Sequence, residues 1–148
     1  MKKRSWTEHL QKKNKINKIL DRASIVARTP ILPCEDRDRV AKSLLNVVDG
    51  DIDEEVIGET RYLVIRTSGR SKIERLFNYF RSKQTLAALR KFLLKYSTNH
   101  EIIFYLHKQA AFNGVLSLAE PGESPGGEII VIISVDESDE IIKWLTRF

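Results

Sequence analysis

The ten residues from His107 to Leu116, His-Lys-Gln-Ala-Ala-Phe-Asn-Gly-Val-Leu, place a cation and an amide side by side between two apolar runs. An ammonium such as that of Lys108 binds phosphate oxygens, and an amide such as that of Gln109 contacts sugar or base edges. The two alanines that follow allow a close approach of backbone or helix, and Gly114 suits a turn or bulge that restarts a strand. We therefore expect a polar connector with RNA-binding potential at this point of the chain.

A second group of cations surrounds a glycine-containing turn from Thr67 to Lys72. The turn stands between a strand pattern and a helix pattern, where backbone N–H groups and cations can meet an anion. It is not a nucleotide P-loop, because the chain has neither G-x-x-x-x-G-K nor G-x-G-x-x-G. We expect either a phosphate-contacting surface or helices with ordinary solvated faces. The cations concerned are Arg66, Arg70, Lys72, Arg75, Arg81, Lys83, Arg90 and Lys91.

The residue types that a catalytic centre or a metal site requires are sparse. Cys34 stands alone and is expected to be an inert thiol, and His100 and His107, at opposite ends of one strand, should point to opposite faces. The carboxylates between Asp49 and Glu59 lack the calcium-loop spacing and suit the solvated face of an edge hairpin. A magnesium site for a nuclease is the alternative at this run. We expect no catalytic residue, no bound metal and no cofactor.

The net charge of +5 is concentrated at the N-terminus. Residues 1–22 hold eight of the 25 lysines and arginines, Lys12 and Lys13 among them, but only two of the 20 acidic residues, so the rest of the chain is nearly neutral. A basic extension on a balanced body can bind a phosphate backbone through counterion release. The alternative is a solvated tail that only aids solubility.

Length and composition favour a single domain. A chain of 148 residues, 42% of them hydrophobic, can bury a core by itself. One cysteine excludes an internal disulfide and suits a reducing compartment. The longest purely apolar run, Ile129 to Ile133, is too short to span a membrane, and the basic N-terminus lacks the apolar segment of a signal peptide. We expect a cytoplasmic protein without a membrane partner, with residues 1–22 as a basic extension and residues 23–148 as one domain.

Hydrophobic periodicity predicts the elements that position these residues. In order, they are a basic N-terminal helix, a strand over 24–31, a helix from about 35 to 49, a hairpin over 52–67, two helices with a break at 82–85, strands over 100–107, 114–118 and 128–135, and a last helix with Ile141 and Leu145. A capping box of Ser71 and Glu74 marks the start of the first paired helix. The order β-α-β-β-α-α-β-β-β-α has too few β-α alternations for a doubly wound parallel sheet. The predicted fold class is α+β, a mostly antiparallel mixed sheet packed by helices.

Two of these strands, over 100–107 and 128–135, are apolar at consecutive positions, which is typical of central or doubly covered strands. Tyr62, Phe104 and Tyr105 are expected to be core residues. No aromatic stacking motif of the RNA-recognition type is visible, so readout of single bases is not expected.

The segment from Lys108 to Leu116 also resembles a known motif. Lys-Gln-Ala-Ala, two residues, Gly, one residue and Leu, after an apolar strand, is similar to the motif of archaeal proteins described as predicted RNA-binding or exosome-associated. The resemblance extends from about Ser24 to Trp144 and leaves the basic extension outside. These proteins are similar in fold to the large-subunit ribosomal protein that carries the 5S ribosomal RNA. The resemblance implies an α+β fold and an RNA partner.

Three functional hypotheses follow. The first is a non-catalytic RNA-binding protein, an accessory factor in RNA processing or a ribonucleoprotein, which contacts structured RNA through phosphates and 2′-hydroxyls. The second is a protein-interaction module that joins partners in an RNA-processing complex or forms a homodimer through its N-terminal helix. The third is a metal-dependent nuclease at Asp51 and Asp53. The residues expected to contact RNA are Lys108, Gln109, Arg66, Arg70, Lys72, Lys83, Lys12 and Lys13.

Overall fold

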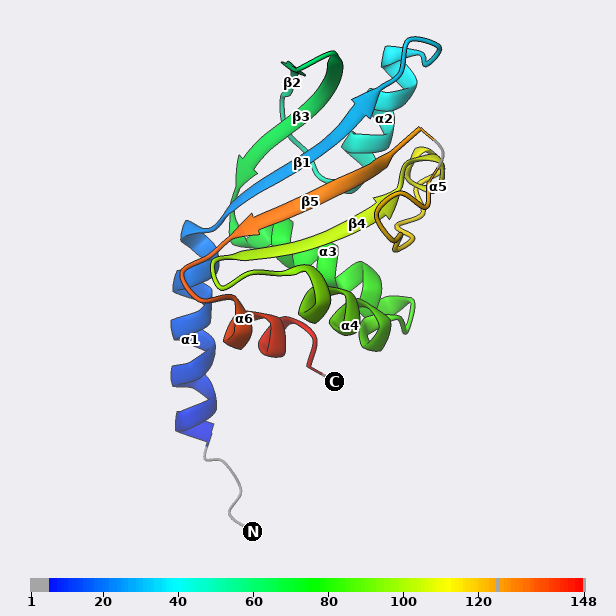
Figure 1. Ribbon diagram of the computed structural model, residues 1–148. Coiled ribbons are helices and arrows are strands. Elements are labelled where there is room, and N and C mark those ends of the chain that lie inside the picture. The colour runs from blue at the N-terminus through cyan, green and yellow to red at the C-terminus, as the bar shows by residue number, and fades with distance from the viewer. Residues whose placement is uncertain (1–5, 125, 148) are drawn as a thin grey trace.

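An antiparallel sheet in the order β2-β3-β1-β5-β4 forms the centre of the computed structural model, which describes residues 6–124 and 126–147 (Figure 1). The strands are β1 (Ser24–Ile31), β2 (Ile52–Ile57), β3 (Thr60–Ser68), β4 (Glu101–His107) and β5 (Glu128–Ser134). The helices are α1 (Trp6–Arg22), α2 (Arg37–Val47), α3 (Arg70–Ser82), α4 (Leu86–Tyr96), α5 (Lys108–Phe112) and α6 (Ser138–Leu145). Each pairing of neighbouring strands is antiparallel, so the predicted α+β class is confirmed.

The central strand β1 has the bounds that its apolar, β-branched residues and the prolines after them predict. Ile25 and Ala27 point toward the helices and are fully buried. Thr29 continues this face, and its hydroxyl donates to the carbonyl oxygen of Glu128 at 3.1 Å, so the buried polar group is satisfied. This bond joins β1 to β5 beyond the backbone ladder.

The helices gather on one face of the sheet, behind and below it in Figure 1. Phe77 and Phe80 of α3 meet Phe104 of β4 edge to face, with ring centroids 6.5 and 6.1 Å apart. Ile16 and Leu20 dock α1 on the same core and are almost fully buried. Among the helices of the described residues, none has both the length and the hydropathy that crossing a membrane requires.

The start of α3 differs from the predicted capping box. The helix begins at Arg70, after Gly69, whose φ of 122° is a conformation that glycine adopts without strain. The chain therefore turns into the helix before it reaches Ser71, and no side chain caps the first turn. The capping box of Ser71 and Glu74 is thus wrong, whereas the predicted break between α3 and α4 is confirmed.

The predicted strand over residues 114–118 is also wrong. Lys108–Phe112 forms the short helix α5, and the N–H groups of Asn113, Gly114 and Val115 bond back to its carbonyls. Gly114 has a φ of 78°, so the chain leaves this helix through a left-handed turn. Only one isolated bridge, between Leu106 and Leu118, pairs the segment with β4. The backbone groups closing α5 cannot also form a strand ladder.

Helices do not cover the second face of the sheet as they cover the first, so the prediction that Tyr62 and Tyr105 are core residues is wrong. Phe104 is fully buried in the core, but Tyr62 and Tyr105 lie half-buried on the opposite face. Adjacent residues of a strand point to opposite faces, so Phe104 and Tyr105 cannot both enter one core. β4 is an edge strand, and on this face Tyr105 meets Tyr96 of α4 edge to face, with ring centroids 5.3 Å apart.

Candidate nucleic-acid interface

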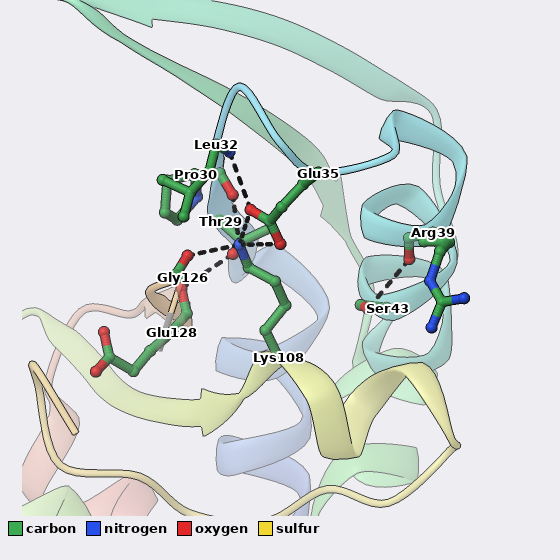
Figure 2. A network of polar contacts seen from close by, with 9 residues as sticks. All are labelled: Thr29, Pro30, Leu32, Glu35, Arg39, Ser43, Lys108, Gly126 and Glu128. Atoms are coloured by element: carbon green, nitrogen blue, oxygen red, sulfur yellow. Dashed lines mark hydrogen bonds and ion pairs between the residues drawn. The ribbon is translucent and has the colours of Figure 1, made fainter. Parts of the chain in front are cut away.

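Lys108 lies inside the protein, with 2% of its side chain exposed. Its ammonium donates to the carbonyl oxygens of Pro30 at 2.6 Å and Gly126 at 2.7 Å, and to Oε1 of Glu35 at 3.0 Å (Figure 2). An ammonium carries three hydrogens, so these acceptors use all of them. The structure therefore places Lys108 in an internal ion pair and not on the surface, where we predicted a phosphate contact.

The partners of Lys108 come from three separate parts of the chain, which close packing holds together. The backbone N–H of Leu32 donates to the Glu35 carboxylate at 2.9 Å. Gly127, at the entry to β5, has a φ of 92°, and a Cβ there would lie 2.5 Å from Cγ of Pro30. Only glycine fits this approach. The Lys108 ion pair thus joins the end of β1, the segment before α2 and the loop before β5.

The remainder of the Lys-Gln-Ala-Ala motif packs α5 against α2. Ala111 is fully buried, and the side-chain amide of Asn46 donates to its carbonyl oxygen at 2.8 Å. Phe112 carries two cations over its ring, with Arg39 Cζ at 4.2 Å and Lys42 Nζ at 4.5 Å from the centroid. The exposed Gln109 joins Arg39 and Phe112 in a cleft of about 300 Å³. Lys108 thus anchors α5 from inside the protein, whereas Gln109 is accessible to solvent.

The cations predicted around the β3–α3 turn are largely neutralised by nearby carboxylates. Arg66 pairs with Glu55, and Arg75 pairs with Asp49 at 3.0 Å. Arg70 lies 3.6 Å from both Asp21 and Glu74. Lys72 donates to the carbonyl oxygen of Asp49 at 3.2 Å and to the hydroxyl of Thr67. Exposed pairs of this kind are weak, but a phosphate would have to compete with each carboxylate.

A different set of cations meets in a cleft between α1, α3 and α6. We call it the Lys13 cleft; its volume is about 210 Å³. Arg81 is held there by bonds to Oδ1 of Asn78 at 2.8 Å and to the carbonyl oxygen of Leu145 at 3.1 Å. Its lining residues are Lys13, Asn17, Leu20, Glu74, Asn78, Arg81, Trp144, Leu145 and Arg147. Three cations thus face one carboxylate, and two amides add hydrogen-bonding groups.

Electrostatic repulsion within the Lys13 cleft affects Arg147. Burial lowers the pKa of its guanidinium, the nearby charge of Arg81 lowers it further, and Glu74 partly offsets both effects by raising it. Arg147 stacks on Trp144, with Cζ 4.0 Å from the ring centroid, which restricts its position. Like charges held close together favour the binding of an anion, because an anion relieves their repulsion.

The other predicted contacts lie apart from this cleft. Lys12 is half-buried on α1 and forms no ion pair with a described residue. Lys83 follows α3, with its ammonium 5.8 Å from the ring centroid of Tyr79. Sequence patterns missed Arg147, an isolated arginine without local signal. They also missed Arg39 and Lys42. Residues three apart lie on the same face of a helix, so this spacing could have indicated a shared cationic surface.

The acidic run around β2 forms ion pairs with arginines. Glu54 accepts a bond from Nε of Arg37 at 2.7 Å, and this bond lowers the pKa of Glu54. Desolvation opposes that effect, and the positive charges of Arg37 and Arg61 lower the pKa further. Asp49 and Glu55 pair with Arg75 and Arg66. Within residues 6–124 and 126–147, no group of three or more His, Cys, Asp or Glu side chains is placed to hold a metal ion.

The fold and its surface define a small α+β protein with a one-sided antiparallel sheet and a cationic cleft among its helices. A family model described as RNA binding matches residues 24–135. The UPF0201 protein TK1335 of Thermococcus kodakarensis is 34% identical over 117 residues, which cover 78% of this chain and 83% of that protein. The UPF0201 protein MK0399 of Methanopyrus kandleri is 34% identical over 131 residues, covering 82% of each.

A solved structure also shows the similarity to UPF0201 proteins. The crystal structure of the UPF0201 protein from Methanococcus jannaschii superposes with a TM-score of 0.67 at 29% identity, over 82% of this chain and 95% of that one. This chain therefore belongs to the UPF0201 family, whose family model carries the description RNA binding. The predicted resemblance is therefore confirmed as membership of an archaeal family whose model is described as RNA binding. Exosome association and similarity to the 5S-binding ribosomal protein stay predictions.

Proposed function

We propose that this protein binds structured RNA without catalysis, as an accessory factor in RNA processing or in a ribonucleoprotein. The observation that carries the proposal is the Lys13 cleft, where Lys13, Arg81 and Arg147 converge and one carboxylate opposes them. Glu74 is itself partly occupied by Arg70 at 3.6 Å. A phosphate in the cleft meets three cations and the two amides of its wall, and such contacts supply most of the sequence-independent affinity for nucleic acid.

The surroundings of the cleft extend the proposed contact. Lys12 and Lys18 of α1 form no ion pair with a described residue, so their charges remain free for phosphates along the same helix. Arg39, Lys42 and Gln109 form a second candidate contact at the α2–α5 surface. The family description supports RNA as the ligand. Because the contacts are to phosphates, we expect recognition of RNA shape and little discrimination between base sequences.

A salt titration tests this function. Binding of the full chain to a labelled RNA hairpin, followed by fluorescence anisotropy, should weaken as salt rises. Lys13→Glu and Arg81→Gln should each lower the slope of log K against log salt by about 1, because each removes one phosphate contact. Together they should weaken binding roughly tenfold at low salt, a free-energy loss of about 1.4 kcal/mol.

Lys91→Glu is the matched control, since Lys91 is an exposed lysine on α4 outside the cleft and changes net charge as Lys13→Glu does. Circular dichroism of each variant checks its fold. Absence of binding by the unaltered protein at low salt contradicts the proposal. An equal loss in Lys91→Glu and Lys13→Glu contradicts the role of the cleft, because net charge alone would then explain the binding.

A further inference from the structure

Trp6, the first residue of α1, is 73% exposed, which is unusual because tryptophan is highly buried on average. It stands on the N-terminal half of α1, which extends beyond the sheet (Figure 1). Its ring stacks on the ring of His9, with centroids 5.9 Å apart and planes 26° apart. With His9 on one side and most of the residue exposed, the other side of the indole is open to a flat partner.

A row of ring contacts connects Trp6 to the Lys13 cleft. His9 lies next to Trp144 of α6, with ring centroids 5.5 Å apart. Trp144 lines the cleft, and Cζ of Arg147 lies 4.0 Å from the centroid of its ring. Aromatic rings at such separations attract each other, so the row holds the indole of Trp6 beside the cleft.

The helix α1 also places Trp6 in line with the cleft. Residues seven apart on an α-helix lie on almost the same side, so Trp6 and Lys13 share one face of α1. Asn17 and Leu20, which line the cleft, continue this face. At 1.5 Å per residue, Trp6 lies about 10 Å from Lys13 along the helix axis. An exposed indole thus stands two helical turns from the cations of the cleft.

The charge of α1 favours nucleic acid as the partner of this indole. The helix carries five lysines and arginines but only two acidic residues. Proteins bind single-stranded nucleic acid through the same combination, in which cations hold the phosphates and aromatic rings stack on the bases. A base stacked on Trp6 brings the phosphates of its strand toward Lys13.

A protein partner fits this surface less well. Among the large apolar side chains that are exposed in the described part of the chain, only Trp6 and Leu10 lie on α1. An aromatic side chain buries at most about 250 Å², whereas a specific protein interface buries about 800 Å² on each partner. Two side chains are too few for a stable protein contact.

We propose that Trp6 stacks on an unpaired base of the RNA whose phosphate occupies the Lys13 cleft. Because the cleft must hold a phosphate, this proposal rests on the RNA-binding function above. The distance of about 10 Å corresponds to about three stacked nucleotides at about 3.4 Å per step. The favoured ligand is therefore a duplex with a single-stranded extension of about three nucleotides or more. Stacking accepts every base, in agreement with weak discrimination between sequences.

Two RNA duplexes with the same single-stranded extension test this proposal, one with its bases and one in which the extension lacks them. Both carry the same phosphates. Fluorescence anisotropy should show that the full chain binds the first at least about fivefold more tightly, the usual effect of one base–aromatic stack. Trp6→Ala should abolish this difference, and Trp6→Phe should keep most of it. Val56→Ala is the matched control and should change neither affinity, because Val56 is 66% exposed on β2, outside α1.

Tryptophan fluorescence gives a second readout, which a purely structural role of Trp6 would not produce. The chain has two tryptophans, Trp6 and Trp144. A base stacked on Trp6 should quench the fluorescence of the unaltered protein. The part of the quenching that depends on the bases should be absent in Trp6→Phe, which keeps Trp144. Circular dichroism checks that each variant is folded.

The possible results separate the stack from the proposed function. Binding of neither RNA contradicts RNA binding and the stack together. Equal binding of both RNAs by the unaltered protein, or an unchanged difference in Trp6→Ala, overturns the stack alone and leaves phosphate binding by the cleft in place. Trp6→Ala that abolishes self-association in sedimentation but keeps the base-dependent difference assigns Trp6 to a protein contact and also overturns the proposal.

Discussion

Replacing Lys108 with methionine should lower the free energy of unfolding by about 3–5 kcal/mol, the usual effect of removing one partner of a buried ion pair. Methionine fills a similar volume but leaves the Glu35 carboxylate and the carbonyl oxygens of Pro30 and Gly126 without their donor. The loss should appear as a lower urea midpoint, with the m-value unchanged.

Lys91→Met is the control for this change, because Lys91 is exposed on α4, and its unfolding free energy should stay within about 0.5 kcal/mol of the unaltered value. Adding Glu35→Met to Lys108→Met should restore part of the stability, since the unpaired carboxylate is then gone. A Lys108→Met protein as stable as the Lys91→Met control would contradict the structural role of the ion pair.

Phe104→Ala should have an effect of similar size, about 3–5 kcal/mol, through the cavity that it leaves in the core. Phe104 is fully buried and meets Phe77 and Phe80, so truncation loosens α3 from the sheet. Because α3 also positions Arg81, RNA binding through the Lys13 cleft should weaken as the unfolded fraction grows. Urea unfolding followed by circular dichroism measures the change.

Tyr105→Ala, in the next position of the same strand, is the matched control. Tyr105 lies on the sheet face turned away from the main core and is half-buried, so its truncation should cost about half as much or less. Equal losses for Phe104→Ala and Tyr105→Ala would mean that both faces of β4 are covered within one chain. That result would contradict the one-sided sheet.

Most elements of the fold were predictable, because local patterns specify them. The β-branched run before Pro33 predicted β1 to the residue, and the turn at Gly58 predicted the β2–β3 hairpin. The motif segment was the exception. Its apolar residues after Gly114 suit a strand, but the hydrogen bonds that close α5 and the packing against α2 outweigh that weak preference.

The site was harder to predict than the fold. Gln109 and Lys13, which we expected to contact RNA, are exposed, and Arg81 was among the cations expected near the α3 turn. Their neighbours were not foreseeable, because Arg147 is more than sixty residues from Arg81 and more than one hundred from Lys13 along the chain. Only the packing of α1 and α6 on α3 brings these three charges into one cleft.

The amino-acid sequence by itself determined the class of this protein: an α+β fold with a basic first helix. Spacing and turn residues carry that information because they act between near neighbours. Only the tertiary structure decided which cations are free. It buried Lys108 against Glu35, neutralised Arg66 and Arg75, and gathered Lys13 with Arg81 of α3 and with Arg147, which follows α6. The physical reason is that the accessibility and pairing of a charge depend on residues far away in the chain.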